Sequence, residues 1–307
     1  MKRDLLRIDS LSPHDIDLLV SQAIELKKRQ KAGVLHQPLR GKTLGLLFEK
    51  PSTRTRVSFE VGMVQLGGHA LYMSSRDTQL SRKESPEDTA RVLSRYLDGL
   101  VIRTFSQDTL EGYARHAAIP VINGLTDLLH PCQILSDLMT IVEKRGDYRR
   151  LNITYVGDGN NVANSWIEAA LKLGFRLRIA CPEGFEPDRM IVARAKAEAP
   201  AQIRFFTDPF EAARDSDIIN TDAWVSMGQE EGIMRRKQEL FKKYQVNRAL
   251  LAAAKKDVLV MHCLPAHRGE EITDEVADGS HAVIFDQAEN RLHMQKAILA
   301  HFLAETA

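Results

Sequence analysis

Short apolar runs alternate with amphipathic stretches along almost the whole chain. The apolar runs have the length expected of strands, and they cover residues 43–49, 69–73, 99–104, 119–124, 151–158, 176–182, 202–208, 216–222 and 257–265. Between them, apolar residues recur at helical spacing, for example over residues 55–66 and 86–98. This alternation predicts an α/β fold in which parallel sheets are flanked by helices. Because such sheets bind ligands beyond the carboxyl ends of their strands, we expect the ligand-binding residues at those strand ends.

The spacing of these elements predicts two domains. The chain has 307 residues, which is about twice the usual size of a single domain. A polar stretch, EKRGDYRR at residues 143–150, separates the first four predicted strands from the last five. We therefore predict a first domain over residues 1–147 and a second over 148–307, with a cleft between them. The last predicted helix, over residues 289–307, is expected to pack back on the first domain.

Composition and charge narrow the class of protein. Lysine and arginine number 42 against 41 aspartates and glutamates, a net charge of +1, which argues against a nucleic-acid partner. The sequence has no run of about 18 apolar residues, and its first residues lack the apolar core of a signal peptide. The three cysteines, Cys132, Cys181 and Cys263, are an odd number at wide spacing, which is typical of a reducing compartment. We expect a cytoplasmic protein that contacts neither membrane nor nucleic acid.

Residues 52–56, STRTR, follow the first predicted strand and open a helix. A helix N-terminus carries partial positive charge and favours acidic side chains, yet Arg54 and Arg56 occupy this first turn. A bound phosphate would resolve the conflict, because backbone N–H groups, hydroxyls and a guanidinium would all face it. In the alternative, Arg54 is solvated and Arg56 pairs with Glu60 at the i,i+4 spacing. The apolar residues at helical spacing, which are expected to be buried on one face of this helix, are Val57, Val61 and Val64.

Two further groups of polar residues are expected at strand ends in the first half. HPCQ, residues 130–133, opens a helix after the fourth predicted strand, so His130 and Gln133 would point toward the strand ends. Such a histidine can donate a hydrogen bond to a carbonyl oxygen, and such a glutamine can contact an amide. The alternative for His130 is a helix N-cap. Arg103 ends a buried strand, where its guanidinium is either a ligand-binding group or a structural one.

The second half offers two comparable positions. GDGNN, residues 157–161, resembles part of a dinucleotide-binding fingerprint, but the third glycine is replaced and no well-placed ribose-binding acid follows. We therefore favour a tight turn from which Asn160 or Asn161 reaches a ligand. Asp222 ends another predicted strand, and Ser226 lies in the loop that follows. An acid and a hydroxyl suit an ammonium or amino-acid substrate, with a capped turn as the alternative.

Cys263 follows the last predicted strand, beside His262 and near His267. A closed zinc site needs four ligands at recognisable spacing, so no metal is predicted here. We expect Cys263 to make a polar contact or to take part in proton transfer, with a thiolate fraction set by the neighbouring charge. The charged stretch over residues 74–88 is interpreted either as a solvated loop or as a lid or arm that reaches a neighbouring subunit.

Taken together and in this order, STRTR, DTQL, HPCQ, GDGNN, SMG, HCLPAHRG and ENRLHMQKA resemble the aspartate/ornithine carbamoyltransferase family over nearly the whole chain. STRTR is shared by the wider family, whereas HPCQ, SMG and HCLP resemble its ornithine branch. The resemblance implies that the first domain binds carbamoyl phosphate and the second binds L-ornithine. It further implies that the carbamoyl group passes to the δ-amine, giving L-citrulline and phosphate as in arginine biosynthesis, without a cofactor or metal. A homotrimer with a shared active site is also implied, with a larger assembly of trimers as the alternative.

The resemblance assigns roles to individual residues. Those implied to bind carbamoyl phosphate are Ser52, Thr53, Arg54, Thr55, Gln79 from the adjacent subunit, Arg103, His130, Gln133, Cys263, Leu264 and Arg291. Those implied to bind ornithine are Asn161, Asp222, Ser226 and Met227, with Asn160 as the alternative to Asn161. The residues implied to act in the reaction are Arg54, Arg103, His130, Asp222 and Cys263. Asp222 and Cys263 are candidates for taking the proton of the ornithine amine, with transfer to the phosphate as the alternative.

Three other functions fit part of the pattern. A carbamoyltransferase for putrescine, aspartate or N-acetylornithine would share the first domain, but Asp222 and the SMG stretch favour the free amino acid ornithine. A non-catalytic protein that binds carbamoyl phosphate or ornithine would be expected to lose Arg103, His130 or Cys263, and all three are present. A nucleotide-dependent oxidoreductase is disfavoured by the broken glycine pattern.

Overall fold

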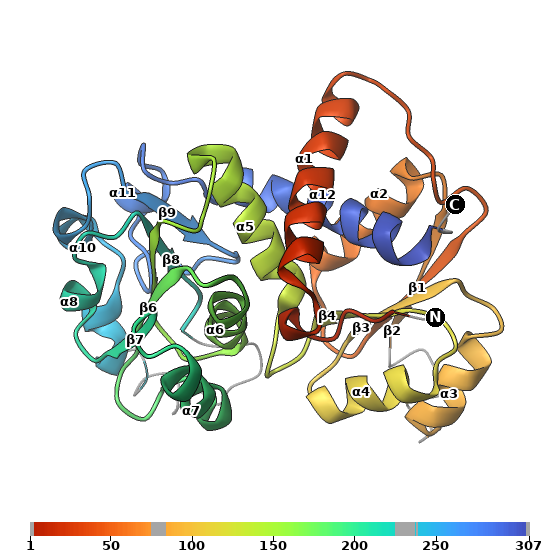
Figure 1. The fold of residues 1–307 in the computed structure, drawn as a ribbon, viewed down its shortest axis with the longest axis horizontal. Helices are drawn as coiled ribbons and strands as arrows, with labels where there is room; N and C mark the ends of the chain where they lie inside the picture. Colours follow the sequence, from red (N-terminus) through yellow and green to blue (C-terminus); the bar gives the residue numbers. More distant parts are fainter. Residues whose placement is uncertain (1–2, 75–83, 225–236, 238, 305–307) are drawn as a thin grey trace. The chain divides into compact units, whose positions relative to one another are not determined.

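The computed structural model describes residues 3–74, 84–224, 237 and 239–304. The chain forms two compact units, the first comprising Met1–Glu143 with Glu289–Ala307 and the second Lys144–Ala288. Each unit contains one parallel sheet flanked by helices, and all nine strands predicted from the sequence are present in the described residues (Figure 1). Within the same ranges, no helix combines the length and the apolar character needed to cross a membrane.

The sheet of the first unit has the order β2-β1-β3-β4. Its strands are β1 (Thr43–Phe48), β2 (His69–Ser74), β3 (Gly99–Arg103) and β4 (Val121–Leu125), all paired in parallel. Phe48 pairs in register with Arg103. The segment that follows β1 and the end of β3 therefore lie at the same edge of the sheet.

Helices cover both faces of this sheet. They are α1 (Pro13–Lys31), α2 (Thr53–Gln65), α3 (Pro86–Leu93), α4 (Gln107–His116), α5 (Pro131–Arg145) and α12 (Ile284–Leu303), preceded by the short η1 (Ile8–Ser10). On one face, α3 and α4 bury a cluster with the strands that includes Ala90, Leu110 and Tyr113. On the other face lie α1, α2 and α12 (Figure 1). A methyl group on Gly99 of β3 would come within 2.9 Å of the Leu303 side chain, which shows how closely α12 approaches the sheet.

The prediction that the valines of α2 face the core was wrong. Val57, Val61 and Val64 are 48%, 36% and 66% exposed, whereas Phe59 and Met63 on another face are fully buried. Phe59 and Met63 are also spaced i,i+4, and these larger side chains remove more apolar surface from water when they turn inward. The three valines therefore form an exposed apolar stripe on the outside of α2, which we call the valine stripe.

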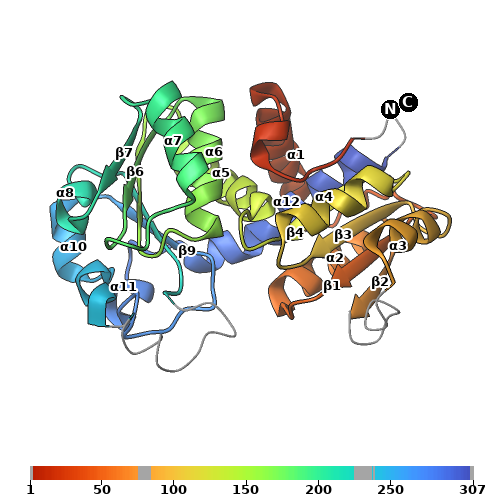
Figure 2. The ribbon, with the colours of Figure 1, turned by 90° about the horizontal axis from the view of Figure 1, so that it is seen from below.

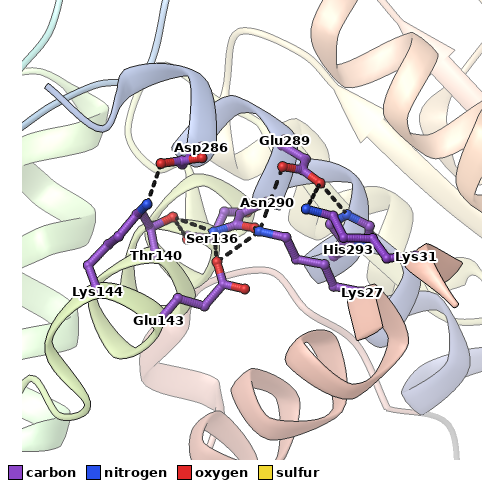
Figure 3. Close-up of polar contacts among 10 residues, drawn as sticks. All are labelled: Lys27, Lys31, Ser136, Thr140, Glu143, Lys144, Asp286, Glu289, Asn290 and His293. Atoms are coloured by element: carbon purple, nitrogen blue, oxygen red, sulfur yellow. Dashed lines mark hydrogen bonds and ion pairs between the residues drawn. The ribbon is translucent and has the colours of Figure 1, made fainter. Parts of the chain in front are cut away.

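Buried polar contacts hold the C-terminal helix in the first unit (Figure 3). Lys27 of α1 donates to Glu143 Oε2 of α5 over 2.9 Å and to Asn290 Oδ1 of α12 over 2.7 Å. The Asn290 amide donates in turn to Glu143 Oε2 over 2.7 Å and to Thr140 Oγ1 over 3.0 Å. A buried charge is tolerated when it is paired and hydrogen-bonded, as Lys27 is here. The network joins α1, α5 and α12, which are far apart in sequence.

The sheet of the second unit has the order β7-β6-β5-β8-β9. Its strands are β5 (Asn152–Val156), β6 (Arg176–Ala180), β7 (Ile203–Phe206), β8 (Ile218–Thr221) and β9 (Leu259–His262). The helices are α6 (Asn161–Leu173), α7 (Arg189–Glu198), α8 (Pro209–Ala213), α10 (Arg248–Ala253) and α11 (Asp274–Ala277), with the short η4 (Lys242–Tyr244). Figure 2 shows α6 and α7 on one face of this sheet, and α8 and α10 on the other. Thr221 pairs in register with His262, so the loops that follow β8 and β9 start side by side.

Candidate active site

The first group of candidate residues lies at the N-terminus of α2. Ser52 caps this helix, because its hydroxyl accepts the backbone N–H of Thr55 over 3.3 Å. The same hydroxyl donates to Thr55 Oγ1 over 3.1 Å. No acidic residue lies in the first turn of α2. Backbone N–H groups and hydroxyls thus gather where the helix carries its partial positive charge.

The two arginines of this turn have different surroundings. Arg56 pairs with Glu60 over 3.0 Å at the i,i+4 spacing, and its guanidinium also stacks on the Tyr72 ring at 3.8 Å. Arg54 has no carboxylate partner among the residues that the structure describes. The structural interpretation is therefore confirmed for Arg56, whereas Arg54 remains the guanidinium available for an anion.

Arg291 connects α2 to α5 within the first unit. Its guanidinium is nearly buried, with 4% of the residue exposed, and it donates to Thr55 Oγ1 over 2.9 Å and to Gln133 Oε1 over 2.6 Å. The Gln133 amide donates to Asp137 Oδ1 over 2.8 Å, which fixes the orientation of the amide. Residues that lie far apart in the sequence, in the STRTR, HPCQ and ENRLHMQKA stretches, are thus joined by hydrogen bonds.

His130 lies directly before α5, and it is 5% exposed. Its carbonyl oxygen accepts the Gln133 N–H over 3.1 Å, so the main chain of His130 begins the helix. Burial, with the guanidiniums of Arg291 and Arg103 nearby, holds the pKa of His130 well below its ordinary value of 6.5. A neutral imidazole among two guanidiniums can donate one hydrogen bond without adding a third positive charge.

In the second unit, Asp222 follows β8 and accepts three hydrogen bonds. Oδ1 accepts the backbone N–H of Ala223 and the thiol of Cys263, each over 2.8 Å, and Oδ2 accepts the Asn160 amide over 2.6 Å. A partly exposed carboxylate in this setting suits an ammonium group as its partner.

Asn160 and Asn161, which follow β5, have different positions and contacts. Asn160 is the N-cap of α6, since its Oδ1 accepts the N–H groups of Val162 and Ala163, and its Nδ2 holds Asp222. Both ends of the Asn160 amide are therefore used inside the protein. Asn161 is the first residue of α6 and is half-buried. The assignment of Asn161 to ornithine remains a prediction.

The glycines of GDGNN are explained by backbone geometry. Gly157 has a φ of +140°, which L side chains rarely adopt. A methyl group on Gly159 would lie 2.2 Å from the backbone of Glu186 and Pro187. This loop is therefore a tight turn against another loop, as predicted, and the glycine pattern does not require a nucleotide.

The three cysteines are free thiols with different surroundings. Cys132 is buried and donates to the Asn123 carbonyl over 3.3 Å, and burial raises its pKa to about 12. Burial also raises the pKa of Cys181. Cys263 is half-buried and donates to Asp222. Of the three thiols, Cys263 is the one placed to meet a ligand.

Two groups of potential metal ligands occur among the described residues of the second unit. Asp222, His262 and Cys263 place one ligand atom each within 4.8 Å of one another, as do His267, Glu270 and Glu271. Both ring nitrogens of His262 are already engaged, because Nδ1 accepts the Leu264 N–H over 2.8 Å and Nε2 contacts Glu271 Oε1 over 2.9 Å. A metal ion at the first group would have to displace one of these contacts.

Three predicted site residues, Gln79, Ser226 and Met227, lie outside the described residues. Most of the 74–88 stretch, interpreted either as a solvated loop or as a lid or arm that reaches a neighbouring subunit, also lies outside the described residues. The predicted binding residues of the first unit are Ser52, Thr53, Arg54, Thr55, Arg103, His130, Gln133 and Arg291, and those of the second are Asn161, Asp222, Cys263 and Leu264.

Two buried pairs beside these residues were not predicted from the sequence. Lys237 Nζ lies 2.5 Å from Asp158 Oδ2, in the turn that carries Asn160, and it contacts the rings of Phe185 and Phe241 at 5.2 and 5.3 Å. Burial raises the pKa of Asp158 above its usual 3.8, although Lys237 opposes the shift. The second pair joins His262 to Glu271. No local pattern links the members of either pair, since each contact depends on how separate loops fold together.

Comparison with known proteins agrees with this geometry. The carbamoyl-phosphate-binding domain of aspartate/ornithine carbamoyltransferases matches residues 3–143, and their aspartate/ornithine-binding domain matches residues 149–302. An ornithine carbamoyltransferase of Syntrophus aciditrophicus is 59% identical over 97% of this chain and 99% of its own length. One from Syntrophotalea carbinolica is 54% identical over 99% of this chain and 100% of its own length.

Solved structures give the same result. The ornithine carbamoyltransferase of Pyrococcus furiosus superimposes with a TM-score of 0.94 at 49% identity, covering 99% of this chain and 98% of that one. The enzyme of Burkholderia thailandensis superimposes with a TM-score of 0.90 at 43% identity, covering 98% of both chains. The resemblance predicted from the motifs is therefore confirmed, and the chain belongs to the aspartate/ornithine carbamoyltransferase family.

Proposed function

We propose that this protein transfers the carbamoyl group of carbamoyl phosphate to the δ-amine of L-ornithine, forming L-citrulline and phosphate in the direction of arginine biosynthesis. The observation that carries the proposal is the first turn of α2. There a capped helix N-terminus, without an acidic residue, presents Arg54 with no carboxylate partner among the described residues. Such a turn suits the phosphate dianion of carbamoyl phosphate. The similarity to enzymes named ornithine carbamoyltransferase supports ornithine as the acceptor.

The phosphate is the leaving group of the reaction. Ser52, Thr53, Arg54 and Thr55 would bind it through the helix N–H groups, the hydroxyls and the guanidinium, with Gln79 as a further ligand. Charge grows on this phosphate as the bond to the carbamoyl carbon breaks. Donors already in place stabilise that charge without having to reorganise.

The carbonyl oxygen of the carbamoyl group gains negative charge when the amine attacks. Arg103, His130 and Thr55 would donate to it, and such donors each lower the barrier by about 3 to 4 kcal/mol in comparable sites. Gln133 is held by Arg291 and Asp137 in a fixed orientation, and the second lone pair of its Oε1 could accept a hydrogen bond from the carbamoyl amide. The resemblance assigns Leu264, a residue of the second unit, to the same substrate.

Ornithine would be bound by Asn161, Asp222, Ser226 and Met227. Its δ-amine is protonated at neutral pH and has to lose a proton before it can attack. The hydrogen bond from Cys263 to Asp222 would place two groups near that amine, a carboxylate that attracts the ammonium and a thiol beside it. Either the Asp222 carboxylate takes the proton directly, or the Cys263 sulfur takes it after passing its own proton to Asp222, or the phosphate of the other substrate takes it.

A homotrimer with a shared active site fits one further observation. The valine stripe of α2 is exposed and apolar, as surfaces that associate with another subunit often are. It lies on the same helix whose first turn would bind the phosphate. In the proposed trimer, a neighbouring copy would cover the stripe and would also supply Gln79, as the resemblance implies. The free thiols suit a reducing compartment, and we place the enzyme in the cytoplasm.

Formation of citrulline tests the proposal. Purified protein supplied with carbamoyl phosphate and ornithine should release phosphate and citrulline in equal amounts. A folded protein that binds carbamoyl phosphate but forms no carbamoylated product with any amine would instead be a binding protein.

A further inference from the structure

The loop that carries Cys263 and Leu264 is held by a fully buried pair. His262, the last residue of β9, places Nε2 2.9 Å from Glu271 Oε1, and both side chains are 0% exposed. Glu271 Oε1 also accepts the backbone N–H of His267 over 2.6 Å. One carboxylate oxygen of Glu271 thus joins the end of the 262–271 loop to its beginning and to its middle.

The hydrogen bonds of the ring define its tautomer. The backbone N–H of Leu264 donates to His262 Nδ1 over 2.8 Å, so Nδ1 is the acceptor nitrogen. Nε2 then carries the hydrogen and donates it to Glu271. In the other tautomer, two N–H groups would face each other at Nδ1. Glu271 therefore determines which ring nitrogen is free to hold Leu264.

Leu264 needs such a restraint. Its φ is +57°, in the left-handed region that a non-glycine residue rarely occupies. A conformation of this kind persists where the surroundings hold it, and it often lies at functional sites. Here the restraint on the Leu264 N–H is the His262 ring, and the residue directly before Leu264 is Cys263, which donates to Asp222.

We infer that Glu271 is a positioning residue for carbamoyl transfer, acting through His262 to hold Cys263 and Leu264 in place. The inference rests on the proposed function. Among the described residues, the hydrogen bonds of the Glu271 side chain go to His262 and His267, and both nitrogens of His262 are occupied within the loop. The pair therefore sets the position of the groups that would meet the substrates, and it does not itself exchange protons with them.

Two substitutions of Glu271 separate the effect of its hydrogen-bond acceptor from the effect of its negative charge. In Glu271→Gln, the remaining carbonyl oxygen can still accept from His262 and His267, because both bonds end on Oε1. This variant should keep kcat within about threefold of the parent. Glu271→Ala loses the acceptor, and the misplaced loop should lower kcat about 30- to 100-fold. KM for carbamoyl phosphate should change by less than about threefold, since most of the groups implied to bind it belong to the first unit.

Asp217 provides a matched control. It is a buried carboxylate of the same unit that also accepts one backbone N–H, from Asn152 over 2.8 Å, and one side-chain N–H, from Lys255 over 2.6 Å. It lies at the start of β8, at the other end of the strand from Asp222. Asp217→Ala should lower the melting temperature as Glu271→Ala does, while kcat stays within about twofold of the parent.

Alkylation of Cys263 reports on the loop without any need for turnover. The thiol donates its hydrogen to Asp222, so release of the loop should expose a freer thiol. With iodoacetamide and mass spectrometry of the Cys263 peptide, Glu271→Ala should react at least about threefold faster than the parent. Glu271→Gln and Asp217→Ala should react at the parental rate. In a His262→Gln background, Glu271→Ala should change neither kcat nor the alkylation rate by more than about twofold, because no ring remains to be held.

The outcomes separate this inference from the proposed function. A parent protein that makes no citrulline contradicts the proposed function, and the alkylation rates then still test the role of Glu271. Unchanged kcat and alkylation in a folded Glu271→Ala variant would overturn the inference. Equal losses of kcat in Glu271→Ala and Asp217→Ala would also overturn it, since the effect would then be one of general stability.

Discussion

Arg291 Nη2 donates a hydrogen bond to Thr55 Oγ1 over 2.9 Å, although the two residues are separated by 236 positions in the chain. The other end of the same guanidinium donates to Gln133. The C-terminal helix α12 therefore brings a cation to the first turn of α2 and to α5. In the proposed reaction, this contact orients a threonine hydroxyl and a glutamine amide before any substrate arrives, so the pocket for the carbamoyl group is formed in advance.

Arg54 and Arg56 allow a matched test of phosphate binding, because they lie two residues apart on one helix. Arg54→Met should weaken binding of carbamoyl phosphate at least about 100-fold, since a charge-assisted contact to a dianion is lost. Arg56→Met should change it less than about threefold, because Arg56 is paired with Glu60. Isothermal titration with carbamoyl phosphate measures both. Equal losses in the two variants would contradict the assignment of Arg54.

Asp222→Asn should affect the second substrate alone. The variant keeps the shape of the side chain but removes the charge that attracts an ammonium group. We expect kcat/KM for ornithine to fall about 100-fold or more, while the Kd for carbamoyl phosphate stays within about twofold, since the residues proposed to bind the phosphate belong to the first unit. Steady-state kinetics with each substrate varied would measure this. A weakened carbamoyl phosphate interaction would place Asp222 elsewhere in the mechanism.

His130 should remain neutral at a pH where an exposed histidine is largely charged. Its folded-state pKa lies well below 6.5, so its contribution to stability is complete above pH 6.5 and is lost as the pH falls toward the folded-state value. NMR of protein labelled in the histidine rings, with His130→Gln to identify the signal, would follow the titration. A midpoint near 6.5 in the folded protein would contradict the described burial.

Lys27→Met should destabilise the protein by about 3 kcal/mol in the free energy of unfolding, because it leaves Glu143 without its buried cation. The neighbouring Lys28 is exposed, and Lys28→Met provides the control, with an expected change below about 0.5 kcal/mol. Urea unfolding measures both values. If the two variants were equally stable, the network of Figure 3 would not be what holds α12 in the first unit.

Val61→Asp should dissociate the proposed trimer. The residue is 36% exposed in the single chain, so a charge there should cost the folded subunit little and should oppose burial against another copy. Sedimentation of the parent as a trimer and of the variant as a monomer is the expected result. Mixing subunits of Arg54→Met with subunits of Gln79→Ala should restore part of the activity if the site is shared. A parent protein that sediments as a monomer would exclude both expectations.

The sequence predicted the strands well because their apolar runs are short, regular and separated by turn signals. It also predicted that STRTR opens a helix after the first strand, and Ser52 caps that helix in the structure. The burial of α2 was predicted wrongly because two apolar faces, one with valines and one with Phe59 and Met63, are both compatible with helical spacing. Spacing alone does not decide which face meets the core.

The site residues also differ in how far the sequence alone could predict them. STRTR and HPCQ were visible because several polar residues occur together after a strand. Glu271 could not be singled out from the sequence, because it is one of two consecutive glutamates in a polar loop. Its role depends on a contact with the buried ring of His262. Asn160 and Asn161 were alternatives for the asparagine that binds ornithine, and the fold shows that Asn160 caps α6 and holds Asp222.

The most direct test of the account is a competition between acceptors. Protein would be given ¹³C-carbamoyl phosphate with equal concentrations of ornithine, putrescine, N-acetylornithine and aspartate, and the carbamoylated products would be resolved by NMR. We expect the label in citrulline, with less than about a hundredth as much in any other product. Label found mainly in another amine would contradict ornithine as the acceptor and with it the proposed role of Asp222.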